Sequence, residues 1–394
     1  MAGIVWGIVA VTMLMAYGSG FRRVLMYTFE SFGQNVIICW PGTTSEQAGG
    51  ERAGQQVKFE PADIDEMRAR AGLVKQVCPE TVRFLGISHN ERTASTAIRG
   101  VCADYGQIRH EIPTSGRWLS AEDALYRRRV VFLGAMVRKN LFAGRPAVGE
   151  TVRIKGMSFT VIGTMDRKFQ DMSYFTSDDE SAWIPYSTAG DLWDTKSASV
   201  LLATPISAEF DRKAQSQILA VLAERQHFSP TDKRAVVMNS TTEFKPIYDM
   251  ICYGLEVLVL LVGLLTLGIG GIGVMNITLV TVNERVREIG LRRALGARRW
   301  HIRMQFLSEA LALTLAGGAA GIALSFGIGA LIGTLPFLGP AYEDTSGVVD
   351  IHLHISWEIL AVSVAVLVLV GVLSGIIPAM RAARLDPVEA LRNE

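Results

Sequence analysis

Three long apolar stretches in the C-terminal third constrain the fold of this chain more than any other feature. Met250 to Val282 carries one charge, Glu256, and Gln305 to Leu338 carries only Glu309. Ile359 to Ile377 carries no charge at all. About 20 helical residues are needed to cross the ~30 Å hydrocarbon core of a bilayer. The stretches therefore predict three transmembrane helices, and the positive mean hydropathy of +0.27 agrees with a membrane protein.

A fourth apolar segment lies at the N-terminus. Ala2 to Tyr17 carries no charge, but it is shorter than a full span, and no basic residue precedes it as in a signal peptide. We interpret it as the first transmembrane helix, truncated at its start, with an atypical signal peptide as the alternative. Phe21, Val24 and Thr28 keep helical spacing, which predicts that the helix continues outward as a stalk.

The charges of the loops predict the orientation. The segment 283–303 holds seven arginines against two glutamates, whereas 336–356 has no Lys or Arg and carries Glu343, Asp344 and Asp350. Basic loops remain in the cytoplasm, so the arginine-rich loop and both termini are expected inside. Residues 18–249 are then expected outside the membrane, and this segment is long enough to form its own core.

The large segment after the first helix has mixed secondary structure. Its clearest pattern is a strand at 130–134, a helix at Ala135 to Phe142, and strands at 151–155 and 158–163 that turn at Gly156-Met157. We expect a short helix from Pro61 to Ala71 and an amphipathic helix from Ser207 to Gln226, with further strands at 35–40, 81–88, 183–186, 199–203 and 235–239. The fold class is therefore a membrane protein with four transmembrane α-helices and an inserted α+β extracytoplasmic domain.

The expected parts follow one another along the chain. They are the first helix (1–18), the outer domain with its stalks (19–249), the second helix (250–282), a cytoplasmic loop (283–304), the third helix (305–338), a short outer loop (339–356), the fourth helix (357–378) and a cytoplasmic tail (379–394).

Enzyme chemistry finds little support in the sequence. There is no G-x-S-x-G, no H-E-x-x-H and no phosphate-binding G-x-x-x-x-G-K-[ST] motif, so no catalytic residue is assigned. His352 and His354 could share one face of a strand, but no Cys or carboxylate accompanies them, so a solvated pair is preferred to a metal site. The net charge of +1 gives no field that favours nucleic acid.

The chain has four cysteines, at 39, 78, 102 and 252. One disulfide among the first three is compatible with an extracytoplasmic domain, but spacing alone cannot supply the geometry of a bridge. Isolated thiols are the preferred interpretation.

Glycines are concentrated in the second apolar stretch. Small residues let helices approach closely in lipid, where packing drives association. The glycines are expected either to pack helices within one chain or to form a dimer interface, and the set is Gly268, Gly270, Gly271 and Gly273, followed by Asn276.

The arginine-rich loop contains a predicted helix, Glu284 to Leu295, which ends at Gly296. Charge pairs at i,i+3 and i,i+4 support it: Glu284–Arg287, Arg285–Glu288 and Glu288–Arg292. Such a helix either lies on anionic headgroups or docks into a groove of another protein. The candidate coupling residues are Glu284, Arg285, Arg287, Glu288, Ile289, Leu291, Arg292, Arg293, Leu295 and Gly296.

Several motifs carry a family resemblance. They are G-G-I-G-V-M-N-I (270–277), N-E-R-V-R-E-I-G-L-R-R-A-L-G-A (283–297), F-L-S-E-A (306–310), P-A-M-R-A-A-R-L-D-P-V-E-A-L-R (378–392) and V-G-E-T-V-R-I-K-G-M-S-F-T-V-I-G (148–163). The chain resembles the MacB/FtsX-type permeases of ABC transporters over nearly its whole length. The resemblance implies the same topology, in the inner (cytoplasmic) membrane of a bacterium, with the large domain in the periplasm.

The resemblance also implies a function and partners. The loop helix is expected to couple to a separate ABC ATPase subunit that carries ATP and Mg, with no cofactor on this chain and no enzymatic activity of its own. Two permeases form the working unit, as a homodimer or a heterodimer, and an adaptor and an outer-membrane channel are further expected partners. ATP-driven motion is expected to reach the periplasmic domain for efflux. The alternatives are an FtsX-like regulator of a cell-wall hydrolase and a lipoprotein-releasing permease.

Overall fold

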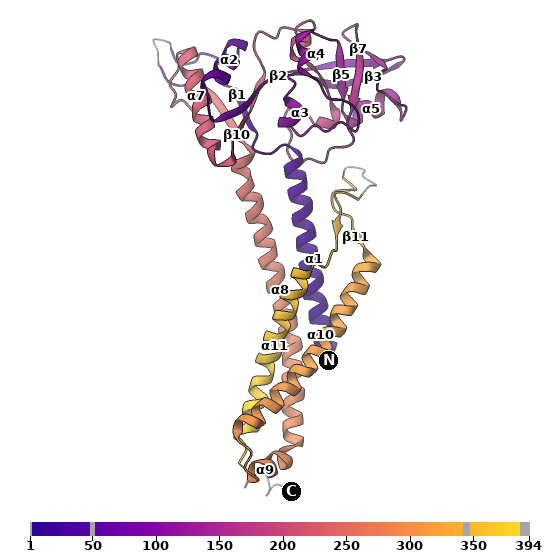
Figure 1. Cartoon of the computed structure of the whole chain (residues 1–394), viewed down its shortest axis with the longest axis vertical. Helices are drawn as coiled ribbons and strands as arrows, with labels where there is room; N and C mark the ends of the chain where they lie inside the picture. The colour runs from indigo at the N-terminus through magenta and orange to yellow at the C-terminus, as the bar shows by residue number, and fades with distance from the viewer. Residues whose placement is uncertain (1, 48–51, 342–346, 387–394) are drawn as a thin grey trace. The chain divides into compact units, whose positions relative to one another are not determined.

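The computed structural model describes residues 2–47, 52–341 and 347–386 (Figure 1). It divides into two compact units, one formed by residues 1–25 and 249–394 and the other by residues 26–248. We call them the helical unit and the inserted domain. Glu343, Asp344 and the last eight residues of the expected tail lie outside the described residues.

The inserted domain is built on one mixed sheet. Its strand order over the described residues is β10-β1-β9-β2-β3-β8-β5-β7-β4, and β6 pairs with both β2 and β7. The strands are β1 (Ile37–Pro41), β2 (Val74–His89), β3 (Arg92–Val101), β4 (Ser115–Gly116), β5 (Val130–Leu133), β6 (Thr151–Ile154), β7 (Met157–Thr164), β8 (Ser181–Pro185), β9 (Val200–Pro205) and β10 (Val236–Ser240).

Short helices cover this sheet. They are α2 (Pro61–Arg70), α3 (Tyr105–Ile108), α4 (Ala121–Leu125), α5 (Ala135–Phe142), α6 (Tyr186–Ala189) and α7 (Asp211–Gln226). One core packs α2 and α7 on β1, β9 and β10, around Phe59, Met67 and Leu222. A second core packs α5 on β5, β6 and β7, and a third lies where Phe32, Phe132 and Trp183 meet. The α+β prediction for this segment is confirmed.

The predicted strand–helix–strand–strand pattern is present as β5, α5, β6 and β7, but its turn is placed one residue earlier than predicted. Lys155 and Gly156 occupy the turn with φ of 47° and 79°, so Met157 already belongs to β7. Two positive φ values are typical of a type I′ hairpin turn, which matches the twist of the flanking strands. Helix α7 begins at Asp211 rather than Ser207, because residues 208–210 form a 3₁₀ turn.

The preference for isolated thiols in this domain is wrong. Cys78 of β2 and Cys102, the residue after β3, form a disulfide with Cα atoms 5.6 Å apart. Neighbouring antiparallel strands bring the two residues together although 24 positions separate them in the sequence. Cys39 and Cys252 are free and buried.

The helical unit contains four helices that are long and apolar enough to cross a membrane, among the described residues. They are α1 (Ala2–Ser31), α8 (Thr241–Glu284), α10 (Arg299–Ile332) and α11 (Trp357–Arg384); α1 and α8 also contribute residues to the inserted domain. A short helix, α9 (Val286–Ala294), lies between α8 and α10 in sequence, and β11 (Thr334–Leu335) pairs with β12 (Ile351–His352).

These helices differ in their limits from the expected segments. The third was expected at 305–338, but it begins at Arg299 and ends at Ile332, because Gly333 takes a φ of 66° and Thr334 starts a strand. The fourth was expected to end at 378, yet α11 continues through Pro378 to Arg384. Both ends of the expected loop 283–304 therefore belong to helices: residues 283–284 to α8 and residues 299–304 to α10.

Candidate functional site: helix α9 and its supports

Helix α9 is shorter than the predicted helix from Glu284 to Leu295. Glu284 is the last residue of α8, and Arg285 leaves the helical conformation before α9 begins at Val286. Leu295 is the C-cap, and Gly296 follows with a φ of 95°, as predicted for the end of this helix. Glycine takes this left-handed conformation without the steric penalty of a side chain. The chain thus bends sharply on both sides of α9.

One side of α9 is buried within the helical unit. Ile289 is 2% exposed and lies in an apolar cluster with Val282 of α8, Phe306 of α10 and Ala382 of α11. Removing such a buried side chain destabilises a core by about 2–5 kcal/mol. The cluster therefore fixes α9 against three of the long helices.

Polar contacts add to this support. The guanidinium of Arg285 lies 3.3 Å from the carboxylate of Glu309 on α10, rather than pairing with Glu288 as predicted. Arg292 donates to Gln305 at 2.6 Å and also pairs with Glu288, which confirms that predicted pair. Arg293 donates to the backbone carbonyl of Leu385, just after α11. The arginines thus hold α9 to both neighbouring helices.

The charge of Glu309 is paired within the chain, which indicates a structural role for it. An unpaired carboxylate deep in a bilayer would be destabilising by ~3 kcal/mol. At the outer end of the unit, Glu256 of α8 likewise lies 3.2 Å from Arg22 of α1. Both charged residues of the predicted apolar stretches thus have a partner of opposite charge.

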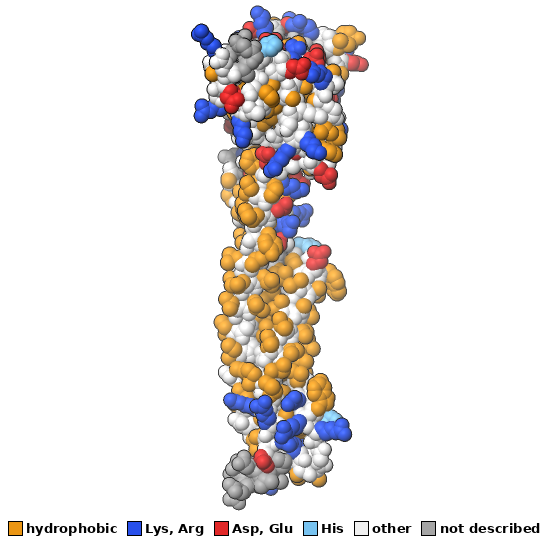
Figure 2. Space-filling view, turned by 90° about the vertical axis from the view of Figure 1, so that its left-hand side faces the viewer, with side chains coloured by type: hydrophobic (Ala, Val, Ile, Leu, Met, Phe, Trp, Pro, Cys, Tyr) orange, Lys and Arg blue, Asp and Glu red, His pale blue; other side chains and the backbone are white. Residues whose placement is uncertain are grey.

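The other side of α9 is open. Leu291 is 52% exposed and Leu295 is 80% exposed, and Arg287 is exposed on the same face at helical spacing. Figure 2 shows hydrophobic side chains as a broad band over the helices of this unit, with Lys and Arg gathered beyond the band at its α9 end. An exposed apolar pair framed by charges on a rigid support is suited to docking by another protein.

The predicted glycine set divides in two. Gly270 lies against Gly3 of α1, and Gly271 lies against Ser374 and Val370 of α11, so these two pack helices within the chain. Gly268 and Gly273 have nothing within 4 Å of where a Cβ would be, and Asn276 is exposed. Gly270 and Gly271 thus lie at helix contacts within the chain, whereas a dimer interface remains a prediction for the open positions.

Sequence reasoning missed a cluster of buried charges in the inserted domain. Arg99, Arg109 and Asp178 are all fully buried there. The sequence contained one indication of this cluster. Arg99 lies between Ile98 and Val101, in a run whose other residues are typical of a buried strand. No group of three potential metal ligands is present among the described residues, and Nε2 of His352 donates to the carbonyl of Gly347 at 3.0 Å.

The architecture of the chain is four long apolar helices, a short supported helix between two of them and an α+β domain inserted after the first. Residues 1–225 match the MacB-like periplasmic core domain, and residues 260–387 match the FtsX-like permease C-terminal region. The chain belongs to this MacB/FtsX family of ABC transporter permeases.

Relatives support this assignment over the full chain. The sequence is 33% identical to the macrolide export ATP-binding/permease protein MacB of Hahella chejuensis, and all of this chain aligns with 57% of that protein. It is 30% identical to YknZ of Bacillus subtilis, described as an uncharacterized ABC transporter permease, and it covers 94% of that protein. The chain thus spans little more than half the length of the MacB relatives.

Two solved structures are similar to part of this chain. The periplasmic region of MacB from Actinobacillus actinomycetemcomitans is 15% identical with a TM-score of 0.45, covering 57% of this chain and 97% of that one. The extracellular domain of YknZ from Gram-positive bacteria is 18% identical with a TM-score of 0.43, covering 52% of this chain and all of that one.

Proposed function

We propose that this chain is the inner-membrane permease subunit of an ABC exporter, and that an ATPase subunit docks on α9. The observation that carries the proposal is the two-sided character of α9: Ile289 is buried in the helical unit, while Leu291 and Leu295 are exposed. A coupling element needs both properties, because it must bind a moving partner and pass the movement to the membrane helices.

The proposed orientation has two independent supports. The arginine-rich α9 region suits the cytoplasm under the positive-inside rule. The Cys78–Cys102 disulfide of the inserted domain suits an oxidising compartment outside the cytoplasm. Because one predicted span, α8, lies between the two parts in the sequence, the proposal assigns them to opposite sides of the membrane.

ATP and Mg are proposed to bind to a separate ATPase subunit. The sequence holds no G-x-x-x-x-G-K-[ST] loop, and the similarity to YknZ extends over nearly all of a chain named as a permease. The MacB relatives, in contrast, are named for ATP binding and permease activity together. This chain would then contribute the permease part and no catalysis of its own.

Export is the direction of transport that we propose, because the MacB relatives are named for it. Helices α1 and α8 each continue from the helical unit into the inserted domain without a break in the helix. Hydrogen-bonded helices are stiff, so displacement at α9 can reach the domain along them. The second permease copy, and an adaptor with an outer channel, belong to the same proposal.

Leu295→Asp tests the proposal. A charge at the centre of a docking surface removes a buried apolar contact, which typically weakens binding by 10-fold or more, that is, by about 1.4 kcal/mol or more. In the purified permease–ATPase complex in vesicles, we expect the variant to lose permease-dependent stimulation of ATP hydrolysis while its inserted domain keeps its melting temperature.

The matched control is Leu125→Asp. Leu125 is 75% exposed, close to the 80% of Leu295, but it lies on α4 of the inserted domain. The control should keep the stimulation. Stimulation that survives Leu295→Asp contradicts docking on α9. Stimulated hydrolysis without outward transport of any compound would instead favour the regulator of a cell-wall hydrolase.

A further inference from the structure

Six charged side chains lie together in the interior of the inserted domain. We call this group the buried charge cluster. None of its members is more than 9% exposed, and four of them carry no exposed surface at all. The three cations are Arg99, Arg109 and Lys168, and the three acidic groups are Glu80, Glu111 and Asp178.

Asp178 is the centre of the cluster. Its carboxylate lies 2.7 Å from Arg109, 2.9 Å from Lys168 and 3.8 Å from Arg99. These cations lower the pKa of Asp178 below its usual range despite its burial. Burying ions is destabilising unless each is paired, and apolar residues of similar size often serve stability equally well. Stability alone therefore does not account for six such groups at one place.

Arg109 is the member of the buried charge cluster that reaches helix α1. Its guanidinium donates to the backbone carbonyl of Phe32, directly after the helix, and lies 3.5 Å from the centre of the Phe32 ring. The last turn of α1 contains no basic residue of its own. A cation at a helix C-terminus satisfies free carbonyls and interacts favourably with the helix dipole. Arg109 supplies that cation from a distant part of the chain.

The end of α1 fits closely against the same loop. Gly33, at a φ of 119°, lies so near the chain that a Cβ there would be 2.4 Å from the carbonyl oxygen of Ile108. Lys168 then donates to the carbonyl of Arg109 at 2.7 Å and to Glu111 at 2.8 Å. The segments on both sides of the α1 terminus are thus tied to the buried charge cluster.

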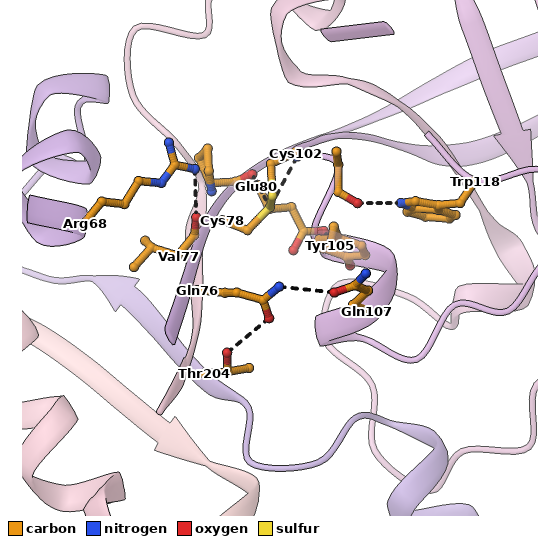
Figure 3. The surroundings of a disulfide bond; sticks show 12 residues. Arg68, Gln76, Val77, Cys78, Glu80, Cys102, Tyr105, Gln107, Trp118 and Thr204 are labelled. Atoms are coloured by element: carbon orange, nitrogen blue, oxygen red, sulfur yellow. Dashed lines mark hydrogen bonds between the residues drawn. A yellow bond between two sulfur atoms is a disulfide. The ribbon is translucent and has the colours of Figure 1, made fainter. Parts of the chain in front are cut away.

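The disulfide lies at the other side of the cluster. Figure 3 shows Cys78 bonded to Cys102, with Glu80 and Tyr105 beside the bridge. Helix α3 begins at Tyr105, three residues after Cys102, and ends at Ile108, immediately before Arg109. Its Gln107 accepts from Gln76 of β2 at 3.3 Å. The bridge thereby restrains the short segment that presents Arg109 to α1.

We infer that Arg109 is a positioning residue that fixes the C-terminal end of α1 in the inserted domain, and that Asp178 orients its guanidinium. The inference deepens the proposed function and rests on it for its purpose: a helix that carries motion must be firmly held at the end that delivers it. A purely structural cluster would stabilise the domain without fixing the direction of α1.

The experiment separates position from stability in the full chain, held in lipid nanodiscs. Spin labels at Tyr27→Cys on α1 and Glu91→Cys in the β2–β3 turn report one distance within the inserted domain, in a Cys39→Ser/Cys252→Ser background. The variants are Arg109→Met, Arg109→Lys, Asp178→Asn and the double variant Arg109→Met/Asp178→Asn. Asp123→Asn is the control, because Asp123 is also a buried ion-paired carboxylate but lies away from α1, beside Arg117.

The unchanged chain and Asp123→Asn should give a single narrow distance. Arg109→Met should broaden the distance distribution. Arg109→Lys keeps the charge but not the planar guanidinium, so its distribution should be intermediate in width. The double variant removes one charge of each sign, so its melting temperature should exceed that of either single variant. Its distance should nevertheless remain broad, and a narrow distance in the double variant overturns the inference.

This outcome is independent of the ATPase test. Leu295→Asp should keep the narrow distance, since α1 remains held in the domain. A narrow distance in Arg109→Met with coupling lost in Leu295→Asp contradicts the positioning role and leaves the proposed function intact. A broad distance in Arg109→Met with coupling retained in Leu295→Asp contradicts docking on α9 and supports the positioning role.

Discussion

Gly270 of α8 lies against Gly3 of α1 so closely that a Cβ at position 270 would be 2.6 Å from the carbonyl oxygen of Gly3. A Cβ at the neighbouring Gly271 would be 2.5 Å from the hydroxyl oxygen of Ser374 of α11. Two successive glycines thus serve two different helix contacts. Gly273, two residues beyond Gly271, meets nothing within 4 Å, and this contrast can be tested directly.

Gly270→Leu should disrupt the contact between α1 and α8. Neither backbone can yield at this distance, and overpacking is destabilising by roughly 1–3 kcal/mol. Gly273→Leu adds the same side chain to an open face and should leave the folding of one chain unchanged. Thermal unfolding in detergent measures both effects, and equal loss in the two variants contradicts the assignment. If Gly273 packs against a second copy, its substitution should instead lower the dimer fraction.

Ile289→Ala should loosen α9 while leaving its exposed surface in place. The side chain is buried among residues of three helices, so we expect destabilisation of this contact by about 2–4 kcal/mol. Amide hydrogen exchange across 286–294 should accelerate. Leu291→Ala, on the exposed side of the same helix, should change exchange little. Equal protection in both variants would show that the apolar cluster does not hold α9.

Glu111→Gln should change how the stability of the inserted domain depends on pH. Burial, and then the nearby Asp178, raise the pKa of Glu111 to about 8. Because this pKa lies above the usual value, the contribution of Glu111 to folding stability is complete at about pH 4 and is lost as the pH rises through about 8. Burial also raises the pKa of Asp179 to about 6, with the same sign.

The free energy of unfolding of the domain should therefore fall between about pH 4 and about pH 8, and the melting temperature should fall with it. Glu111→Gln should make the decline shallower between about pH 6 and about pH 8. The decline below about pH 6 that comes from Asp179 should remain. Asp123→Asn is the control, since Arg117 and Ser120 hold the pKa of Asp123 well below its usual range despite its burial. A decline that is unchanged in Glu111→Gln would exclude Glu111 as its source.

Reduction of the Cys78–Cys102 bridge should destabilise the inserted domain by about 3 kcal/mol, because it frees a loop of 24 residues in the unfolded chain. Cys78→Ser/Cys102→Ser should have the same effect and should make the domain insensitive to reductant. Thiol counting on the denatured chain provides a separate check. Before reduction only Cys39 and Cys252 should react, whereas all four cysteines should react afterwards. Four reactive thiols without reductant would contradict the bridge.

Cys39→Ser is the matched control for these cysteine variants. Burial raises the pKa of Cys39 to about 12, so its thiol should be unreactive while the domain is folded. Its substitution should leave the effect of reductant on the melting temperature unchanged. An altered response would indicate that Cys39 takes part in disulfide exchange.

Patterns of local origin were predictable in this chain. Uncharged runs of about 20 residues predict long helices. The alternating apolar and polar residues at 151–163, interrupted by a glycine, predict a hairpin. Helix ends were less predictable, since Gly333 ends α10 while Pro378 does not end α11. Proline within a helix is tolerated where neighbouring helices pack around it, which the sequence does not reveal.

The sequence by itself determined four apolar helices, an α+β domain between the first two and a short basic helix ended by Gly296, because each follows from local periodicity and composition. Tertiary structure alone decided which glycines touch another helix, which arginine pairs with Glu309, and that Cys78 meets Cys102. It also brought Arg109 to the end of α1 and Asp178 to Arg109, from positions 77 and 69 residues apart. Such contacts depend on strand order and loop paths, and these are set by the packing of the whole domain rather than by any one segment.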